Sequence, residues 1–66
     1  MKKYTIIAKV DKMKFVKYRT NHIQKTIDFL IKKFGNVLYA NIYFKTGINK
    51  GLQMGSYGKN KGLILN

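Results

Sequence analysis

Apolar side chains recur every three or four residues in one stretch of the chain, residues 20–35. Five of them fall on a single stripe of an α-helix: Ile23, Ile27, Leu30, Ile31 and Phe34. Asn21 and Gln24 have the spacing of a capping box, and Gly35 is the residue type that ends a helix in the left-handed conformation. The pattern predicts one amphipathic helix, against which the rest of the chain packs.

Before this helix, two stretches rich in β-branched and aromatic side chains, residues 3–10 and 13–20, predict two strands. Asp11-Lys12 between them is a candidate two-residue hairpin turn, although it lacks the usual glycine. With that turn, the core-facing side carries Tyr4, Ile6, Ala8, Val10, Met13 and Phe15. The opposite side carries Thr5, Ile7, Lys9, Lys14, Val16 and Tyr18.

After the helix, residues 36–45 have the clearest strand pattern in the chain. One face carries side chains suited to packing on the helix: Leu38, Ala40, Ile42 and Phe44. The other face carries Val37, Tyr39, Asn41 and Tyr43. Two tyrosines beside an asparagine are unusual for a covered face, so we expect this side to meet solvent or a partner.

Residues 46–66 contain a repeat, GINKGL at 47–52 and GKNKGL at 58–63, whose copies lie eleven residues apart. Asn-Lys-Gly suits a tight turn, because asparagine tolerates and glycine favours a positive φ. The repeat predicts either two turns of a meander around a strand at 52–57, or lysine-tipped loops whose backbone amides and lysines hold phosphates. A tail that orders only on binding is a third alternative.

These elements predict an α+β fold in the order ββαβ(ββ), a single small domain over residues 1–66. One antiparallel sheet packs on one α-helix, and residues 46–66 form a Gly/Lys-rich hairpin or a flexible tail. A core this small supplies on the order of 3–5 kcal/mol of net stability, so a homodimer is an open alternative.

The charge balance is more informative about function than any motif in the sequence. The chain carries 14 Lys and Arg against two Asp and no Glu, a formal net charge of +12. An AT-rich codon bias accounts for abundant lysine, but it also favours glutamate, which is absent. Strong self-repulsion destabilises a compact domain unless an anionic partner relieves it. The composition therefore predicts a polyanionic partner.

Few side chains of the chain could act in catalysis or bind a metal ion. The chain has no Cys, one His and two Asp. Asp11 is expected in a turn, Asp28 on the helix exterior and His22 at the helix start, so we expect no enzyme, no cofactor and no metal site. The basic start with a short apolar run breaks at Lys9 without a cleavage site, which favours a strand over a leader. We expect a cytoplasmic protein with no membrane attachment.

Aromatic residues interleaved with basic ones predict binding of DNA or RNA, with lysines on the phosphate backbone and sheet tyrosines on the bases. The candidate nucleic-acid-binding residues are Lys9, Lys14, Lys17, Tyr18, Arg19, Tyr39, Tyr43, Lys45, Lys50, Tyr57, Lys59 and Lys61.

The alternative function is a small effector, of the kind that phages or plasmids encode, which binds an acidic surface of a protein partner and inhibits or modulates it. Phe29 is the candidate protein-interface residue, because it lies off the apolar stripe of the helix. Contact with residues 46–66 or with a second subunit would also account for Phe29.

Overall fold

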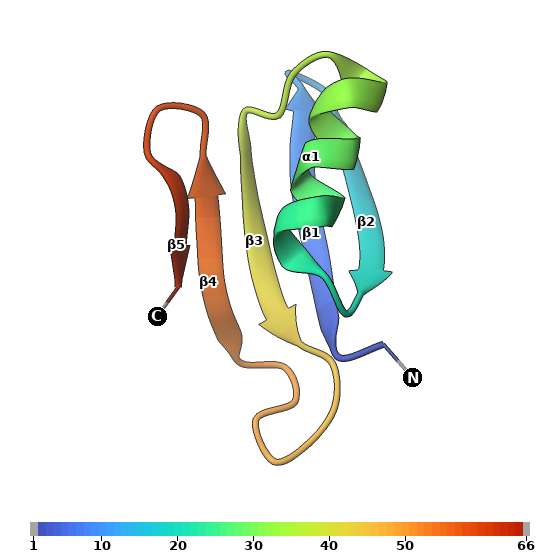
Figure 1. Ribbon diagram of the computed structural model, residues 1–66, viewed down its shortest axis with the longest axis vertical. Coiled ribbons are helices and arrows are strands. Elements are labelled where there is room, and N and C mark those ends of the chain that lie inside the picture. Colours follow the sequence, from blue (N-terminus) through green and yellow to red (C-terminus); the bar gives the residue numbers. More distant parts are fainter. Residues whose placement is uncertain (1, 66) are drawn as a thin grey trace.

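The computed structural model describes residues 2–65. The elements in chain order are β1 (Tyr4–Asp11), β2 (Lys14–Thr20), α1 (Ile23–Phe34), β3 (Tyr39–Phe44), β4 (Gln53–Gly58) and β5 (Gly62–Leu65). The strands form one antiparallel sheet in the order β2-β1-β3-β4-β5, with α1 lying across one face (Figure 1). The predicted α+β fold, one antiparallel sheet on one helix, is confirmed.

The apolar stripe predicted for the helix faces the sheet. Ile27 and Leu30 are fully buried, and the other members of the stripe pack at the edge of the core. Gly35 has a φ of 76°, and its N–H donates to the carbonyl oxygen of Ile31 at 2.8 Å. The helix therefore ends where the glycine predicts, because only a residue without Cβ adopts this left-handed conformation at low cost.

The start of the helix differs from the prediction. The N-cap residue is His22, and its side chain makes no capping hydrogen bond. Asn21 instead accepts a hydrogen bond from the backbone N–H of Lys3 at 2.7 Å, so the predicted capping box is wrong. The Thr20 hydroxyl accepts the N–H of His22 at 2.9 Å, and the Thr26 hydroxyl donates to the His22 carbonyl at 2.8 Å. Threonines thus hold the β2–α1 connection.

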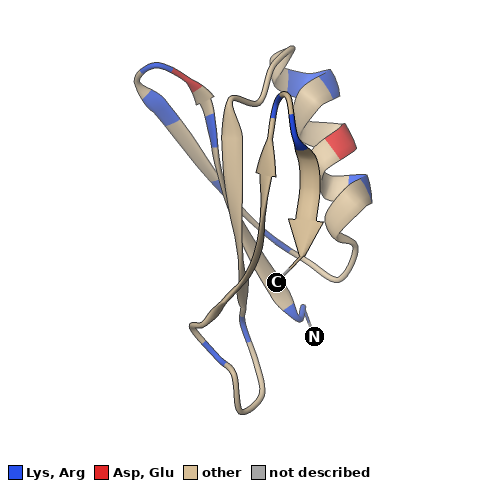
Figure 2. Ribbon diagram, turned by 90° about the vertical axis from the view of Figure 1, so that its left-hand side faces the viewer, with Lys and Arg blue, Asp and Glu red and all other residues tan. Residues whose placement is uncertain are grey.

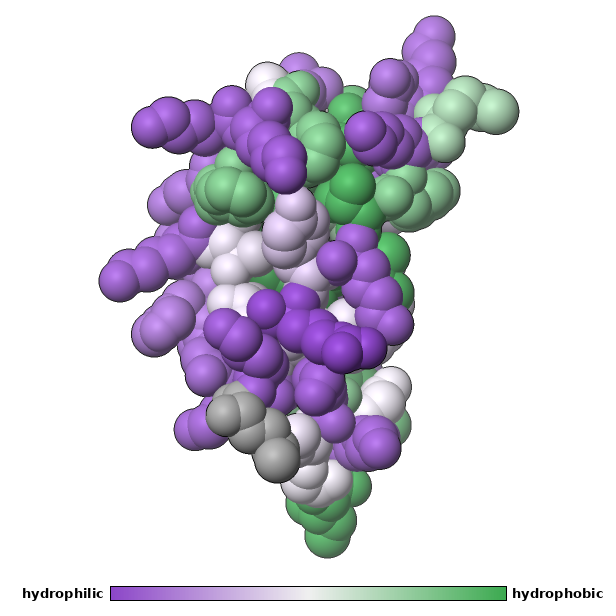
Figure 3. Space-filling view, turned by 90° about the vertical axis from the view of Figure 1, so that its right-hand side faces the viewer, coloured by the Kyte–Doolittle hydropathy of each residue, from purple (hydrophilic) through white to green (hydrophobic). Residues whose placement is uncertain are grey.

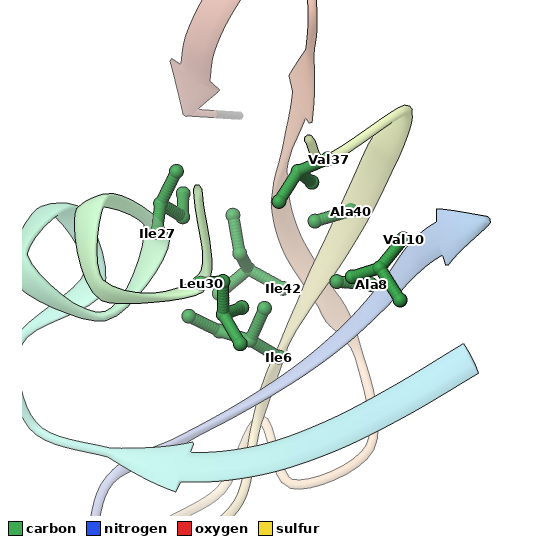
Figure 4. Packing of buried hydrophobic residues seen from close by; sticks show 8 residues of the cluster. All are labelled: Ile6, Ala8, Val10, Ile27, Leu30, Val37, Ala40 and Ile42. Carbon is green, nitrogen blue, oxygen red and sulfur yellow. The ribbon is translucent and has the colours of Figure 1, made fainter. Parts of the chain in front are cut away.

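The buried core lies between the helix and one face of the central strands. It consists of Ile6, Ala8, Val10, Ile27, Leu30, Val37, Ala40 and Ile42 (Figure 4). Val37 was predicted to face away from the helix, yet it is only 2% exposed. The reason is that β3 begins at Tyr39, so Val37 belongs to the connection from α1 and the two-residue alternation does not apply to it.

The β1–β2 hairpin has a different register from the predicted one. The turn residues are Lys12 and Met13, one position later than expected. Two residues of β1 advance against one of β2 between the pairs Lys9–Phe15 and Asp11–Lys14, which is a β-bulge. A one-residue slip moves every side chain to the other face. The predicted faces of β2 are therefore reversed, and Met13 and Phe15 are not in the core, with 93% and 56% of their surface exposed.

We call the side of the sheet that packs on the helix the inner face, and the opposite side the outer face. The helix lies over β1 and β2, whereas β4 and β5 extend beyond it (Figure 1). Within residues 2–65 no second layer covers the outer face, and the helix stands on the other side when the molecule is viewed along the sheet (Figure 2). The outer face is therefore accessible to a partner.

Candidate nucleic-acid interface

Two aromatic rings lie together at one end of the outer face. Lys9 of β1 is paired with Phe15 of β2 on one side and with Tyr39 of β3 on the other. The rings of Phe15 and Tyr39 reach over Lys9, with their centroids 6.4 Å apart at an angle of 71°. The Lys9 ammonium lies 5.6 Å from the Phe15 centroid, within cation–π range. We call Lys9, Phe15 and Tyr39 the aromatic end.

The middle of the outer face is polar and flat. Ile7 of β1 lies between Lys17 of β2 and Asn41 of β3 in the sheet, and Asn41 is paired with Ser56 of β4. The Asn41 side-chain oxygen accepts a hydrogen bond from the Gln53 amide at 3.3 Å. Amides, hydroxyls and a lysine stem around one isoleucine form a surface that tolerates water, unlike the inner face.

At the other end, the outer face is hollowed into a groove of about 460 Å³. Four cations line it: Lys17, Arg19, Lys45 and Lys50. Two come from β2 and two from the β3–β4 connection, and Thr5, Ile7 and Tyr43 of the sheet are among the other lining residues. None of the lining residues is acidic. We call this feature the basic groove.

Residues 45–52 extend past the end of the sheet (Figure 1), and Lys45, Lys50 and Gly51 of this segment form the far wall of the groove. Backbone hydrogen bonds fix their shape: Gly51 N–H donates to Phe44 O at 2.8 Å, and Phe44 N–H donates to Leu52 O at 3.0 Å. The N–H of Lys50 donates to Gly47 O at 3.2 Å. The N–H groups of Phe44, Lys50 and Gly51 are therefore engaged within the protein, and the groove offers an anion its cationic side chains.

Neither carboxylate of the chain lines the basic groove, although Asp11 lies only two residues beyond Lys9 in β1. Asp11 ends β1 beside the hairpin turn, and its carboxylate accepts the N–H of Lys12. Asp28 lies on the exposed side of the helix and accepts a hydrogen bond from Gln24 at 2.9 Å. Both positions stand out from the rest of the ribbon in Figure 2. The positive potential of the basic groove is therefore not neutralised by any lining carboxylate.

Seven of the predicted nucleic-acid-binding residues meet on the outer face or in its groove. They are Lys9, Lys17, Arg19, Tyr39, Tyr43, Lys45 and Lys50. Phe15 joins them, although the sequence placed it in the core. The missing glycine in the expected turn was the available signal that another turn position, and hence the other register, was open.

Five predicted residues lie elsewhere. Tyr18 is on the inner face, 5.8 Å from the Phe29 ring, and Lys14 lies with its ammonium 5.1 Å from the Phe34 ring. Tyr57 is paired with Ala40 and packs against the core. The remaining two, Lys59 and Lys61, are in the β4–β5 turn. The reversed register of β2 removes Tyr18 from the outer face, and the alternation of β4 removes Tyr57.

Phe29, the predicted protein-interface residue, is 47% exposed on the helix. Its contact is the ring of Tyr18 on β2, and the Lys33 ammonium lies 5.6 Å from its centroid. The helix lies over β2, and residues 46–65 are at the other end of the sheet, so Phe29 does not pack on that segment. From the β2 side, hydrophilic side chains dominate the surface and apolar groups show between them (Figure 3).

Residues 2–65 contain neither a membrane-spanning helix nor a cluster of metal ligands. No helix there has the length and apolar character to cross a membrane. No group of three or more His, Asp or other ligating side chains in that range could hold a metal ion. No protein family, curated protein or solved structure matches this chain. The geometry of the outer face is therefore the basis for any functional conclusion.

Proposed function

We propose that the protein binds single-stranded nucleic acid on the outer face of its sheet. The observation that supports this most is an uncovered sheet face on which aromatic rings stand among cations and whose basic groove is lined by no carboxylate. Phe15 and Tyr39 offer ring surfaces for stacking, while Lys9, Lys17 and Arg19 neutralise the sugar-phosphate backbone. Stacking on an aromatic side chain contributes about 1–3 kcal/mol per base.

The shape of the face favours single strands over duplex. The major groove of DNA admits a helix or a two-stranded ribbon, and an open five-stranded sheet is too broad to enter it. The bases of a single strand, by contrast, are free to lie flat on exposed rings. The polar middle of the outer face argues against a second protein layer, since a covered face would carry Leu or Val at Asn41 and Ser56.

The test is fluorescence anisotropy with single-stranded DNA, single-stranded RNA and duplex of the same length, at low and at physiological salt. We expect single strands to bind more tightly than duplex. If about six phosphates are engaged, log affinity falls with log salt at a slope near −4. Binding that is flat across this salt range would overturn the proposal, and would favour the acidic surface of a protein partner instead.

A matched pair of variants tests the surface itself. Tyr39→Ala removes a ring from the outer face, whereas Tyr57→Ala removes one from the inner face. We expect Tyr39→Ala to weaken single-strand binding and Tyr57→Ala to leave the affinity of the folded protein unchanged. Equal losses in both variants would mean that neither tyrosine contacts a base and that they act through folding.

A further inference from the structure

We infer that the basic groove binds the terminal phosphate of a nucleic-acid strand, so that the protein prefers strands with a phosphorylated end. The inference rests on the proposed function and specifies what its outer face selects. We identify the phosphate by its charge, because several cations lie together in the groove, whereas cations elsewhere on the outer face are isolated.

The cations of the outer face are concentrated in the basic groove. At the aromatic end, Lys9 is the cation between the two rings. In the basic groove, four cations from two separate segments line one volume, and no lining residue is acidic. A terminal phosphomonoester carries a charge of about −1.5 to −2 at pH 7, whereas an internal phosphodiester carries a single charge. The denser positive charge matches the denser anion.

The far wall of the groove lies at the end of the sheet. Lys45, Lys50 and Gly51 line the groove where the sheet ends, and backbone hydrogen bonds hold this segment in place. The N–H of Lys45 also donates to Lys3 O at 2.8 Å, which ties this wall to the start of β1. A strand lying along the outer face meets this wall, so the groove suits a strand terminus better than a continuing chain.

The distance between Tyr39 and Tyr43 along β3 suits a strand that starts in the groove. Tyr43 forms part of the groove, and Tyr39 lies on the same face four residues earlier in β3. Four residues of a strand span about 13 Å. A strand whose terminal phosphate lies in the groove can therefore place its first base beside Tyr43 and a later base at the aromatic end.

The experiment compares four forms of one single-stranded oligonucleotide: 5′-phosphorylated, 3′-phosphorylated, hydroxyl at both ends, and circular. Affinities are measured by anisotropy competition at physiological salt. We expect one phosphorylated form to bind about tenfold more tightly than the hydroxyl form, and the circle to bind no more tightly than the hydroxyl form. Equal affinity of all four forms overturns the inference.

Two groove variants locate the effect. Arg19→Ala and Lys50→Ala each remove one exposed cation from the groove, and Lys59→Ala in the β4–β5 turn is the matched control. The readout is the ratio of the affinity for the phosphorylated form to that for the hydroxyl form. We expect the ratio to fall toward one in both groove variants and to stay unchanged in Lys59→Ala. An unchanged ratio in the groove variants would overturn the assignment to the groove.

Arg19→Lys separates charge from geometry. Arginine binds two phosphate oxygens with a planar fork, whereas lysine acts as a point charge. We expect this variant to retain part of the preference, with a ratio between those of the wild type and Arg19→Ala. A ratio in Arg19→Lys as low as that in Arg19→Ala would mean that the paired hydrogen bonds of the arginine fork, and not charge alone, select the phosphate.

Failure of this inference is distinct from failure of the proposed function. If the outer face binds single strands without selecting an end, the four forms bind equally and Tyr39→Ala still weakens all of them. If the proposed function is wrong, the hydroxyl and circular forms do not bind at physiological salt and Tyr39→Ala has no effect. The second result overturns both proposals, and the first overturns only the groove.

Discussion

The two faces of one strand, β1, have opposite surroundings although their residues alternate along the chain. Ile6 and Ala8 on the inner face are fully buried. Ile7 and Lys9, the next residue after each of them, lie on the outer face and are partly exposed. The helix covers one side of the sheet and none of the described residues cover the other, so the same strand serves as core and as surface. Substitutions on the inner face therefore test folding, and substitutions on the outer face test the proposed binding.

The largest expected difference between the faces is in stability. Leu30→Ala removes a fully buried side chain from the helix and should lower the free energy of unfolding by about 2–5 kcal/mol. Phe15→Ala removes a larger group from the outer face and should cost well under half as much, because Phe15 is 56% exposed. Urea denaturation of both variants measures this. A comparable cost for Phe15→Ala would contradict an uncovered outer face.

Two glycines of β4 sharpen the comparison within one strand. A Cβ on Gly55 would lie 2.6 Å from the carbonyl oxygen of Ile64 in β5, whereas a Cβ on Gly58 meets only the Lys61 side chain at 3.6 Å or more. Gly55→Ala should cost about 1–3 kcal/mol through displacement of β5, as overpacking does. Gly58→Ala should be neutral or slightly stabilising, since neither glycine has a positive φ. Thermal denaturation distinguishes the two, and equal melting temperatures would contradict the close β4–β5 approach.

The tyrosine pair should separate affinity from stability. Tyr39→Ala should weaken single-strand binding by about 1–3 kcal/mol, the contribution of one stacked base, with little change in the unfolding midpoint. Tyr57→Ala should do the reverse, because Tyr57 packs against the core. Titration and urea denaturation on the same preparations provide both quantities. A stability loss in Tyr39→Ala that matches Tyr57→Ala would place both rings in the folded interior.

The smallest expected effect is on the salt dependence. Lys17→Ala on the outer face removes one phosphate contact and should reduce the slope of log affinity against log salt by about 0.7, the value for a single strand. Lys25→Ala on the exposed side of the helix is the control, with the same charge change and no expected change in slope. Identical slopes for the two variants would mean that the charge acts over the whole molecule and not at the outer face.

The sequence alone determined the elements whose patterns are local. The stripe from Ile23 to Phe34 and the glycine after it define the helix, because the spacing of apolar residues and the left-handed φ of Gly35 both depend on neighbours within one turn. Likewise, Ala40 and Ile42 were expected on the helix side of β3 and are fully buried there. The charge imbalance, a property of composition, also needed no coordinates.

Only the tertiary structure decided which residues share the outer face. One extra residue at the β1–β2 bulge moved Phe15 out of the core and Tyr18 into contact with the helix. Asn21 bonds to Lys3, which is 18 residues away in the chain, and so is lost as a helix cap. Strand register and long-range hydrogen bonds depend on partners distant in sequence, and a shift of one position reverses every side chain of a strand. The set of residues on the outer face therefore depends on strand pairing, whereas the helix follows from the local sequence pattern.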